Sequence, residues 1–194
     1  MANRESGITL REGARVLIRS PRAADRREYC AIRRDSHDFL TPWEPVPARP
    51  VTEEERFDQL LHSNRSEDLE RVFVCARDDG RILGNINISN IVRGCFQSAV
   101  LGYWCRQDAA GQGFMTEGLR LVAEFAFEDL GLHRLEANIQ PSNAPSIGLV
   151  RRVGFQQEGY SPRYLKIAGE WRDHERWTLL AEDWRTAAET RPEP

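Results

Sequence analysis

The sequence predicts an α/β fold with a mixed, mostly antiparallel central sheet flanked by helices. Two observations lead to this fold class: a run of strand candidates separated by turn signals, and a later alternation of strands with amphipathic helices. The chain shows no internal repeat and no linker long enough to divide it. We therefore expect one domain over residues 1–194, with a core at about 15–184 and a disordered C-terminal tail of about ten residues.

The first part of the chain predicts one strand and two helices around a stiff loop. Leu10 and Val16–Ile18 indicate an opening strand, and Pro21 suits the start of a helix that reaches about Arg34. Four prolines in Thr41–Pro50 exclude helix and central strand there. The segment Thr52–Glu55 is typical of a capping box that opens a second helix, with Phe57, Leu60 and Leu61 on its buried face.

The middle of the chain predicts an antiparallel meander. The strand candidates are Arg71–Ala76, Ile82–Ile91 and Ala99–Cys105. The separators Asp78-Asp79-Gly80 and Arg93-Gly94 carry the residues that tolerate the positive backbone angles of tight turns.

The last third alternates helices and strands. Apolar residues at helical spacing predict a long helix that ends at Gly131: Met115, Leu119, Val122, Ala126 and Leu130. The remaining predicted elements are the strand Leu132–Ile139, the helix Asn143–Val153 closed by Gly154, the strand Phe155–Tyr160, and a pair of strands, Tyr164–Ile167 and Trp171–Leu180.

Composition excludes several classes of protein. The chain has 40% hydrophobic residues and a net charge of −3, which argues against a disordered protein and, more weakly, against direct nucleic-acid binding. It has no apolar run of about 18 residues, and charged residues stand near its start, so we expect no membrane partner and a cytoplasmic protein. Its four cysteines form no C-x-x-C pair, and no H-x-x-H is present, so no metal is expected.

One loop is predicted to bind an anion. The segment Arg106–Glu117 joins a strand to the long helix and contains Gly111 and Gly113, so unpaired backbone amides and the helix dipole would converge on one point. A P-loop would need a lysine, which is missing, and a dinucleotide fingerprint would need a glycine where Thr116 stands. Taken alone, the loop is equally compatible with a simple turn.

The motifs resemble a known family when they are read together. They are Leu101–Trp104, Gly111–Leu119, Asn138, Pro141–Asn143 with Ser146, Val153–Phe155 and Glu158–Tyr160, supported by Phe39–Pro45, Ser89–Gly94 and Gly169–His174. In order and spacing, they resemble the GCN5-related N-acetyltransferases (GNAT), and within them the RimJ/RimL-type branch that acetylates the amino-terminal alanine of ribosomal proteins. The resemblance covers about 15–184. Ala110 and Met115 depart from the family's loop pattern, but backbone amides, which any residue supplies, would still hold a diphosphate.

The resemblance implies an acetyl-CoA-dependent N-acetyltransferase and a set of coenzyme-binding residues. The implied acceptor is a protein amino terminus, such as that of a ribosomal protein. The coenzyme-binding residues would be Trp104, Cys105, Arg106, Gly111, Gln112, Gly113, Phe114, Met115, Thr116, Asn138, Asn143 and Ser146. Ser146 would stand near the coenzyme sulfur, where a hydroxyl can act on the departing thiolate.

The chemistry of the acceptor favours weak bases. An α-amino group titrates near ~8 and a lysine near ~10.4, so an amino terminus is already partly neutral at physiological pH. By analogy with the family and by their chemistry, the candidate bases are Glu44, Asp173 and His174, each of which is equally compatible with a structural role. Trp43, Tyr164 and Trp171 are candidates for the wall of an acceptor groove.

Other functions remain open at this level. The same coenzyme site would serve a transferase for a small-molecule amine, or a sensor that binds acetyl-CoA without catalysis. The sequence is compatible with a monomer or a homodimer.

Overall fold

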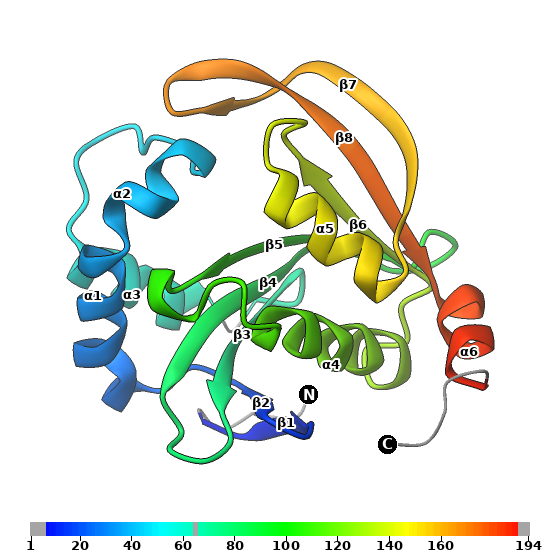
Figure 1. Cartoon of the computed structure of the whole chain (residues 1–194), viewed down its shortest axis with the longest axis horizontal. Helices are drawn as coiled ribbons and strands as arrows, with labels where there is room; N and C mark the ends of the chain where they lie inside the picture. Colours follow the sequence, from blue (N-terminus) through cyan, green and yellow to red (C-terminus); the bar gives the residue numbers. More distant parts are fainter. Residues whose placement is uncertain (1–6, 64–65, 190–194) are drawn as a thin grey trace.

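The computed structural model of the chain describes residues 7–63 and 66–189. Its centre is an eight-stranded sheet in the order β1-β2-β3-β4-β5-β6-β8-β7, in which the β5–β6 pair is parallel and the other pairs are antiparallel. The strands are β1 Thr9–Glu12, β2 Val16–Arg19, β3 Leu69–Ala76, β4 Ile82–Val92, β5 Ser98–Cys105, β6 Arg134–Ile139, β7 Gln156–Ile167 and β8 Glu170–Leu180. The helices are α1 Arg26–Asp35, α2 His37–Leu40, α3 Glu53–Ser63, α4 Phe114–Glu128, α5 Ala144–Val153 and α6 Ala181–Glu189, with 3₁₀ turns at Ala23–Asp25, Thr41–Trp43 and Gln107–Ala109 (Figure 1). The predicted fold class is confirmed.

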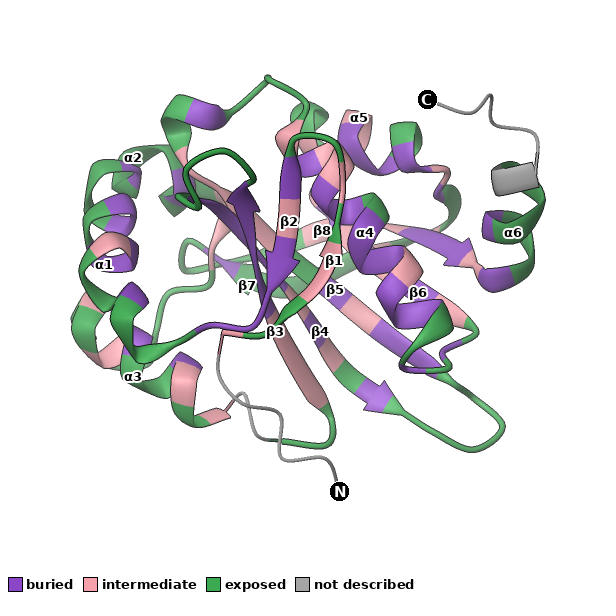
Figure 2. Ribbon diagram, turned by 90° about the horizontal axis from the view of Figure 1, so that it is seen from below, coloured by how far each residue is buried: buried purple, intermediate pink, exposed green. Residues whose placement is uncertain are grey.

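Helices cover both faces of the sheet. Alternate residues of β3 belong to two separate clusters: Val72 and Val74 pack in the cluster of α4 and α5, and Phe73 and Cys75 pack in that of α1 and α3. Figure 2 shows buried residues concentrated in the strands and in α4. The five apolar positions that predicted α4 are all buried.

The two parallel strands pair over only part of their length. The ladder runs from Ser98 opposite Arg134 to Leu101 opposite Ala137. The last four residues of β5, 102–105, continue to pair with β4 but have no such partner in β6. The sheet is therefore open between the end of β5 and β6, next to the loop that enters α4.

Several predicted elements are confirmed in detail. In the capping box of α3, the Thr52 Oγ1 accepts from the Glu55 amide at 3.1 Å, and the Glu55 carboxylate accepts from the Thr52 amide at 3.0 Å. The meander is antiparallel, as expected. Gly131 and Gly154 both have positive φ, at 64° and 111°, after α4 and α5.

Four predictions on the elements were wrong. The opening strand is a hairpin of β1 and β2, and the proline loop begins with a 3₁₀ turn at Thr41–Trp43. The two strands predicted at Phe155–Tyr160 and Tyr164–Ile167 are one strand, β7, which crosses an irregular region where Arg163 has a φ of 48° and its amide donates to Asp173. The tail is helical as far as Glu189 because α6 buries Ala181 and Trp184 against the core. The rest of the predicted tail, 190–194, lies outside the described residues.

Candidate active site

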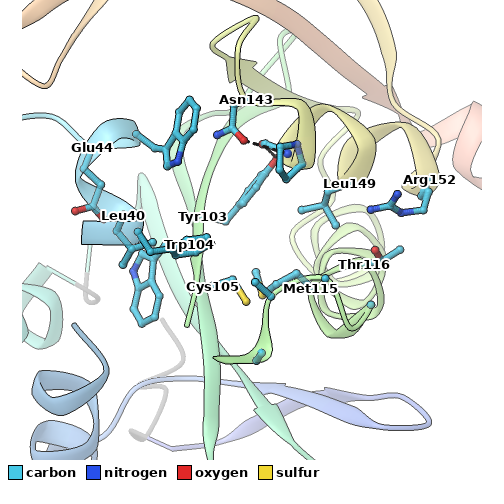
Figure 3. A pocket seen from close by; sticks show the side chains of 18 residues that line it. Leu40, Glu44, Tyr103, Trp104, Cys105, Met115, Thr116, Asn143, Leu149 and Arg152 are labelled. Atoms are coloured by element: carbon cyan, nitrogen blue, oxygen red, sulfur yellow. Dashed lines mark hydrogen bonds between the residues drawn. The ribbon is translucent and has the colours of Figure 1, made fainter. Parts of the chain in front are cut away.

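A cavity of about 610 Å³ lies where β5, α4 and α5 meet (Figure 3). Its walls come from the end of β5, the loop before α4, the first residues of α4, one face of α5, and the segment from α2 through the 3₁₀ turn. Ten of the predicted site residues line it: Trp43, Glu44, Trp104, Cys105, Gly111, Gly113, Met115, Thr116, Asn143 and Ser146. The structure thus brings together residues that are about 100 positions apart in the chain.

The loop before α4 has the geometry of an anion site. Gly111 and Gly113 have φ angles of +74° and +83°, which only glycine adopts without strain. Within the described residues, the backbone N–H groups from Gly111 to Met115 donate no hydrogen bond to the protein. They stand at the positive end of a helix of 15 residues. Several donors and a helix dipole therefore point toward one region of the cavity.

The β1–β2 hairpin holds this loop in place. A guanidinium nitrogen of Arg15 donates to the Gln112 carbonyl at 3.2 Å, and the guanidinium lies 4.8 Å above the centre of the Phe114 ring. The Glu117 carboxylate accepts from the Arg15 amide at 2.7 Å. Both the side chain and the backbone of Arg15 therefore join the hairpin to this loop and to α4.

Three predicted coenzyme residues in this loop turn their side chains elsewhere and do not line the cavity. The Gln112 amide nitrogen donates to the Asp108 carbonyl at 2.7 Å. Arg106 donates to Asp108 and, at 3.1 Å, to the Ile82 carbonyl. Phe114 is covered by Arg15. Any contribution of these residues to the coenzyme would come from the backbone.

Met115 and Ala110, the two departures from the family's loop pattern, are both accommodated. Met115 is buried, and its sulfur lies over Gly84 of β4, where an added Cβ would stand only 2.7 Å from it. The Trp104 carbonyl oxygen would stand even closer, at 2.5 Å, so both β5 and Met115 occupy the space that a side chain at Gly84 would need. Ala110 lines the cavity beside Gly111.

A pair of hydroxyl groups lies on the wall between β5 and α5. Ser146 is in the first turn of α5, and its amide donates to the side chain of Asn143, which caps the helix, at 3.2 Å. The Tyr103 Oη lies 2.7 Å from the Ser146 Oγ. Sequence reasoning missed Tyr103, although it is part of the motif Leu101–Trp104; no pattern in one strand reveals which residue of a distant helix faces it.

Asn138 is on the other face of the sheet. Its neighbours Ala137 and Ile139 are buried in the cluster of α4 and α5, so alternation turns Asn138 to the opposite face, and Asn138 does not line the cavity. Its side-chain amide donates to Glu136 at 2.9 Å.

The three candidate bases have different surroundings. Glu44 lines the cavity, and both its oxygens accept from the buried guanidinium of Arg33 at 2.6 Å. Asp173 and His174 do not line it. Asp173 accepts from the Tyr160 hydroxyl at 2.5 Å and from the Arg163 amide at 2.7 Å, and these two hydrogen bonds lower its pKa.

His174 is buried in β8, with Nδ1 3.0 Å from the Arg172 carbonyl and Tyr164 edge-on at 5.7 Å between ring centres. Burial lowers its pKa.

The predicted aromatic wall is divided between two places. Trp43 lines the cavity, but Tyr164 and Trp171 are exposed on the β7–β8 hairpin. The turn of this hairpin reaches the proline loop, since the Ala168 amide donates to the Glu44 carbonyl at 3.1 Å. In Figure 1 the hairpin extends over the side of the molecule that carries α2.

The Cys105 thiol lines the cavity with its proton in place. Burial raises its pKa to about 11, so a thiolate nucleophile is not available at neutral pH. Within 7–63 and 66–189, no cluster of three or more His, Cys, Asp or Glu could hold a metal ion. The helices in these same ranges are all too short or too polar to cross a membrane.

The fold and the site are those of an acyltransferase in which the sheet opens beside a loop of unpaired backbone amides. The chain matches the acetyltransferase (GNAT) domain family over residues 15–156, and it belongs to that family. It is an N-acetyltransferase that uses acetyl-CoA as its co-substrate.

The similar proteins include ribosomal-protein acetyltransferases. A probable N-acetyltransferase of Bacillus subtilis, YjcK, is 31% identical over 89% of this chain and 97% of its own length. The ribosomal protein uS5 alanine N-acetyltransferase of Escherichia coli is 32% identical over 88% of this chain and 90% of its own. Among solved structures, Mycobacterium smegmatis RimJ in complex with a CoA disulfide has a TM-score of 0.80 and 30% identity, covering 91% of this chain and 90% of that one.

Proposed function

We propose that this N-acetyltransferase transfers the acetyl group to the α-amino group of a protein, with a small first residue, such as the alanine of a ribosomal protein. The observation that carries the proposal is the cavity itself, which brings Gly111 and Gly113 of the loop before α4 together with Ser146, Glu44 and Trp43. Two relatives whose names refer to uS5 alanine or to RimJ support the same acceptor. A ribosomal acceptor would agree with the cytoplasmic location that the sequence predicts.

In this proposal, the acetyl-CoA diphosphate binds to the free amides from Gly111 to Met115, beside Thr116 and the guanidinium of Arg152. The pantetheine would pass between β5 and α5, where Asn143 and Leu149 line the cavity. The thioester would then reach the opening in the sheet at the end of β5.

The end of β5 also offers a donor for the thioester oxygen. The Arg106 amide donates to Leu83 of β4. Because successive N–H groups of a strand point to opposite sides, the Cys105 amide points away from β4, toward the unpaired side. An amide in this position would stabilise the negative charge that develops on the carbonyl oxygen.

The proton from the attacking amine needs an acceptor in the cavity. Of the three candidates, Glu44 alone lines the cavity in the described part of the chain. Each carboxylate oxygen has a second lone pair beyond its bond to Arg33, and this lone pair can accept from a water molecule that relays the proton. A partly neutral α-amine requires no stronger base.

The experiment compares two peptides of identical sequence, with thiol release from acetyl-CoA as the readout. One has a free amino-terminal alanine and no lysine; the other has a blocked amino terminus and one internal lysine. We expect acetylation of the first, because a lysine would need its pKa lowered by about two further units. Preferential acetylation of the blocked peptide, or of a small amine such as a polyamine, would refute the amino-terminal acceptor and leave the family assignment intact.

A further inference from the structure

Tyr103 is the feature of the cavity that the proposed function leaves without a role. It is on β5, and Figure 3 shows its side chain directed from the strand toward α5. Its Oη lies 2.7 Å from the Ser146 Oγ, a normal distance for a hydrogen bond between two hydroxyl groups. The partner is itself fixed, because the Ser146 amide is held by the cap at Asn143.

The geometry allows either hydroxyl to donate, and the phenol has a proton to give. Burial raises the pKa of Tyr103 to about 12, so the phenol keeps its proton throughout the neutral range. Within the described residues, the Ser146 Oγ is the hydrogen-bond partner of this phenol. If the phenol donates to Oγ, the Ser146 proton is directed elsewhere. Ser146 lines the cavity, so a proton that is not used on the phenol can be donated into the cavity.

We propose that Tyr103 is a positioning residue for Ser146: its phenol donates to the Ser146 Oγ and thereby directs the Ser146 hydroxyl proton into the cavity, toward the sulfur of the coenzyme. This inference rests on the proposed function in one respect, namely that Ser146 acts on the departing thiolate. In this proposal Tyr103 lines the cavity but acts on the reaction through Ser146.

Release of the coenzyme thiolate needs no reactant beyond the amine and acetyl-CoA. The C–S bond of the tetrahedral intermediate breaks, and its electron pair goes to sulfur. Ser146 stabilises the thiolate by donating a hydrogen bond, and the proton that finally neutralises the sulfur is the one that the amine loses. Tyr103 keeps its proton from beginning to end, so its contribution is to the orientation and acidity of Ser146.

The test is a double-mutant cycle of Tyr103→Phe and Ser146→Ala, in which phenylalanine keeps the ring and removes only the hydroxyl. With the amino-terminal peptide as acceptor, we expect Tyr103→Phe to lower kcat about tenfold, the effect of one lost hydrogen bond, and to leave the KM for acetyl-CoA nearly unchanged. In the Ser146→Ala background, Tyr103→Phe should lower kcat no further. A loss of the same size in both backgrounds, or an unchanged kcat in Tyr103→Phe, would overturn the inference.

A second readout needs no acceptor. It is the pKa of the thiol of bound coenzyme A, measured by the ultraviolet absorbance of the thiolate. We expect this pKa to be about one unit lower in the parent than in Tyr103→Phe. Ser146→Ala and the double variant should have the same thiol pKa as each other. This pattern without acetyl transfer would refute the proposed function but not the role of Tyr103. Acetyl transfer with an unchanged thiol pKa in Tyr103→Phe would refute the role of Tyr103 but not the proposed function.

Discussion

At the scale of single residues, a neighbour decides what a carboxylate can do. Glu44 and Asp173 are both acidic residues in segments that resemble the family, but their partners differ. Glu44 is fixed by Arg33, whose guanidinium also lies 5.5 Å from the centre of the Trp104 ring and 3.3 Å from Glu53. Asp173 instead holds together the irregular part of β7. The first carboxylate faces the cavity and the second supports a strand.

This difference predicts the outcome of two matched substitutions. Glu44→Gln should lower kcat by about a hundredfold, because the amide cannot accept the proton of the amine. Asp173→Asn makes the same chemical change outside the cavity and should leave kcat near that of the parent. Steady-state kinetics on both variants checks this. If Glu44→Gln retains the parent's turnover, its carboxylate serves only to hold Arg33.

A stability measurement accompanies the kinetics of Glu44→Gln. Arg33 would keep Glu53 but lose one charged partner, so we expect the free energy of unfolding to fall by about 1–2 kcal/mol. The assay temperature must lie below the unfolding transition of the variant.

At the scale of elements, the position of the anion loop depends on how closely α4 approaches the sheet. Gly118, in the second turn of α4, is buried over Val74 of β3, and an added Cβ would be 2.7 Å from both methyl groups of that valine. A helix interior ordinarily disfavours glycine by about 1 kcal/mol relative to alanine. Here the close packing requires it.

We therefore predict that Gly118→Ala destabilises the protein by about 1 kcal/mol, since the overpacking penalty exceeds the gain in helix propensity. Gly148→Ala in α5 is the matched control: its added Cβ would meet only the end of the Arg152 side chain, at 3.3 Å, so it should be neutral or stabilising. Urea unfolding measures both. Val74→Ala removes the methyl groups that the new Cβ would meet, so Gly118→Ala should cost less in the Val74→Ala background. If the changes in unfolding free energy of the two single variants simply add in the double variant Gly118→Ala/Val74→Ala, this account is wrong.

At the scale of the whole molecule, the β7–β8 hairpin connects the far edge of the sheet with the proline loop. It is anchored by the contact of Ala168 with Glu44 and by the burial of His174 between Tyr164 and the backbone of β8. His174 does not line the cavity, and its titration affects the stability of the fold.

The stability should fall on mild acidification. Burial lowers the pKa of His174 in the folded chain, whereas the unfolded chain titrates near ~6.5. Above this value neither state binds the proton. Below it, the unfolded state binds a proton that the folded state does not, so the free energy of unfolding falls by up to about 1.4 kcal/mol per pH unit until the folded pKa is reached.

His174→Gln should weaken this dependence, because the amide does not titrate. The measurement is the free energy of unfolding by urea at a series of pH values from neutral to about one unit below the pKa of the unfolded chain. Identical slopes in the parent and in His174→Gln would show that other groups cause the dependence.

The sequence by itself determined the fold class, the middle elements from β3 to α5 and the loop with its two glycines, because these depend on local patterns: alternation, helical spacing, caps and turns. It also pointed to the family. The capping box of α3 and the five buried apolar positions between Met115 and Leu130 needed no knowledge of distant residues.

Only the tertiary structure decided which of the candidate side chains share a cavity. It separated Glu44 from Asp173 and His174, turned Asn138 to the other face, and placed Tyr103 against Ser146. The physical reason is that a side chain's chemistry depends on neighbours that are distant in the chain. The packing of α4 and α5 on the opened sheet brings these neighbours together, and no local pattern encodes it.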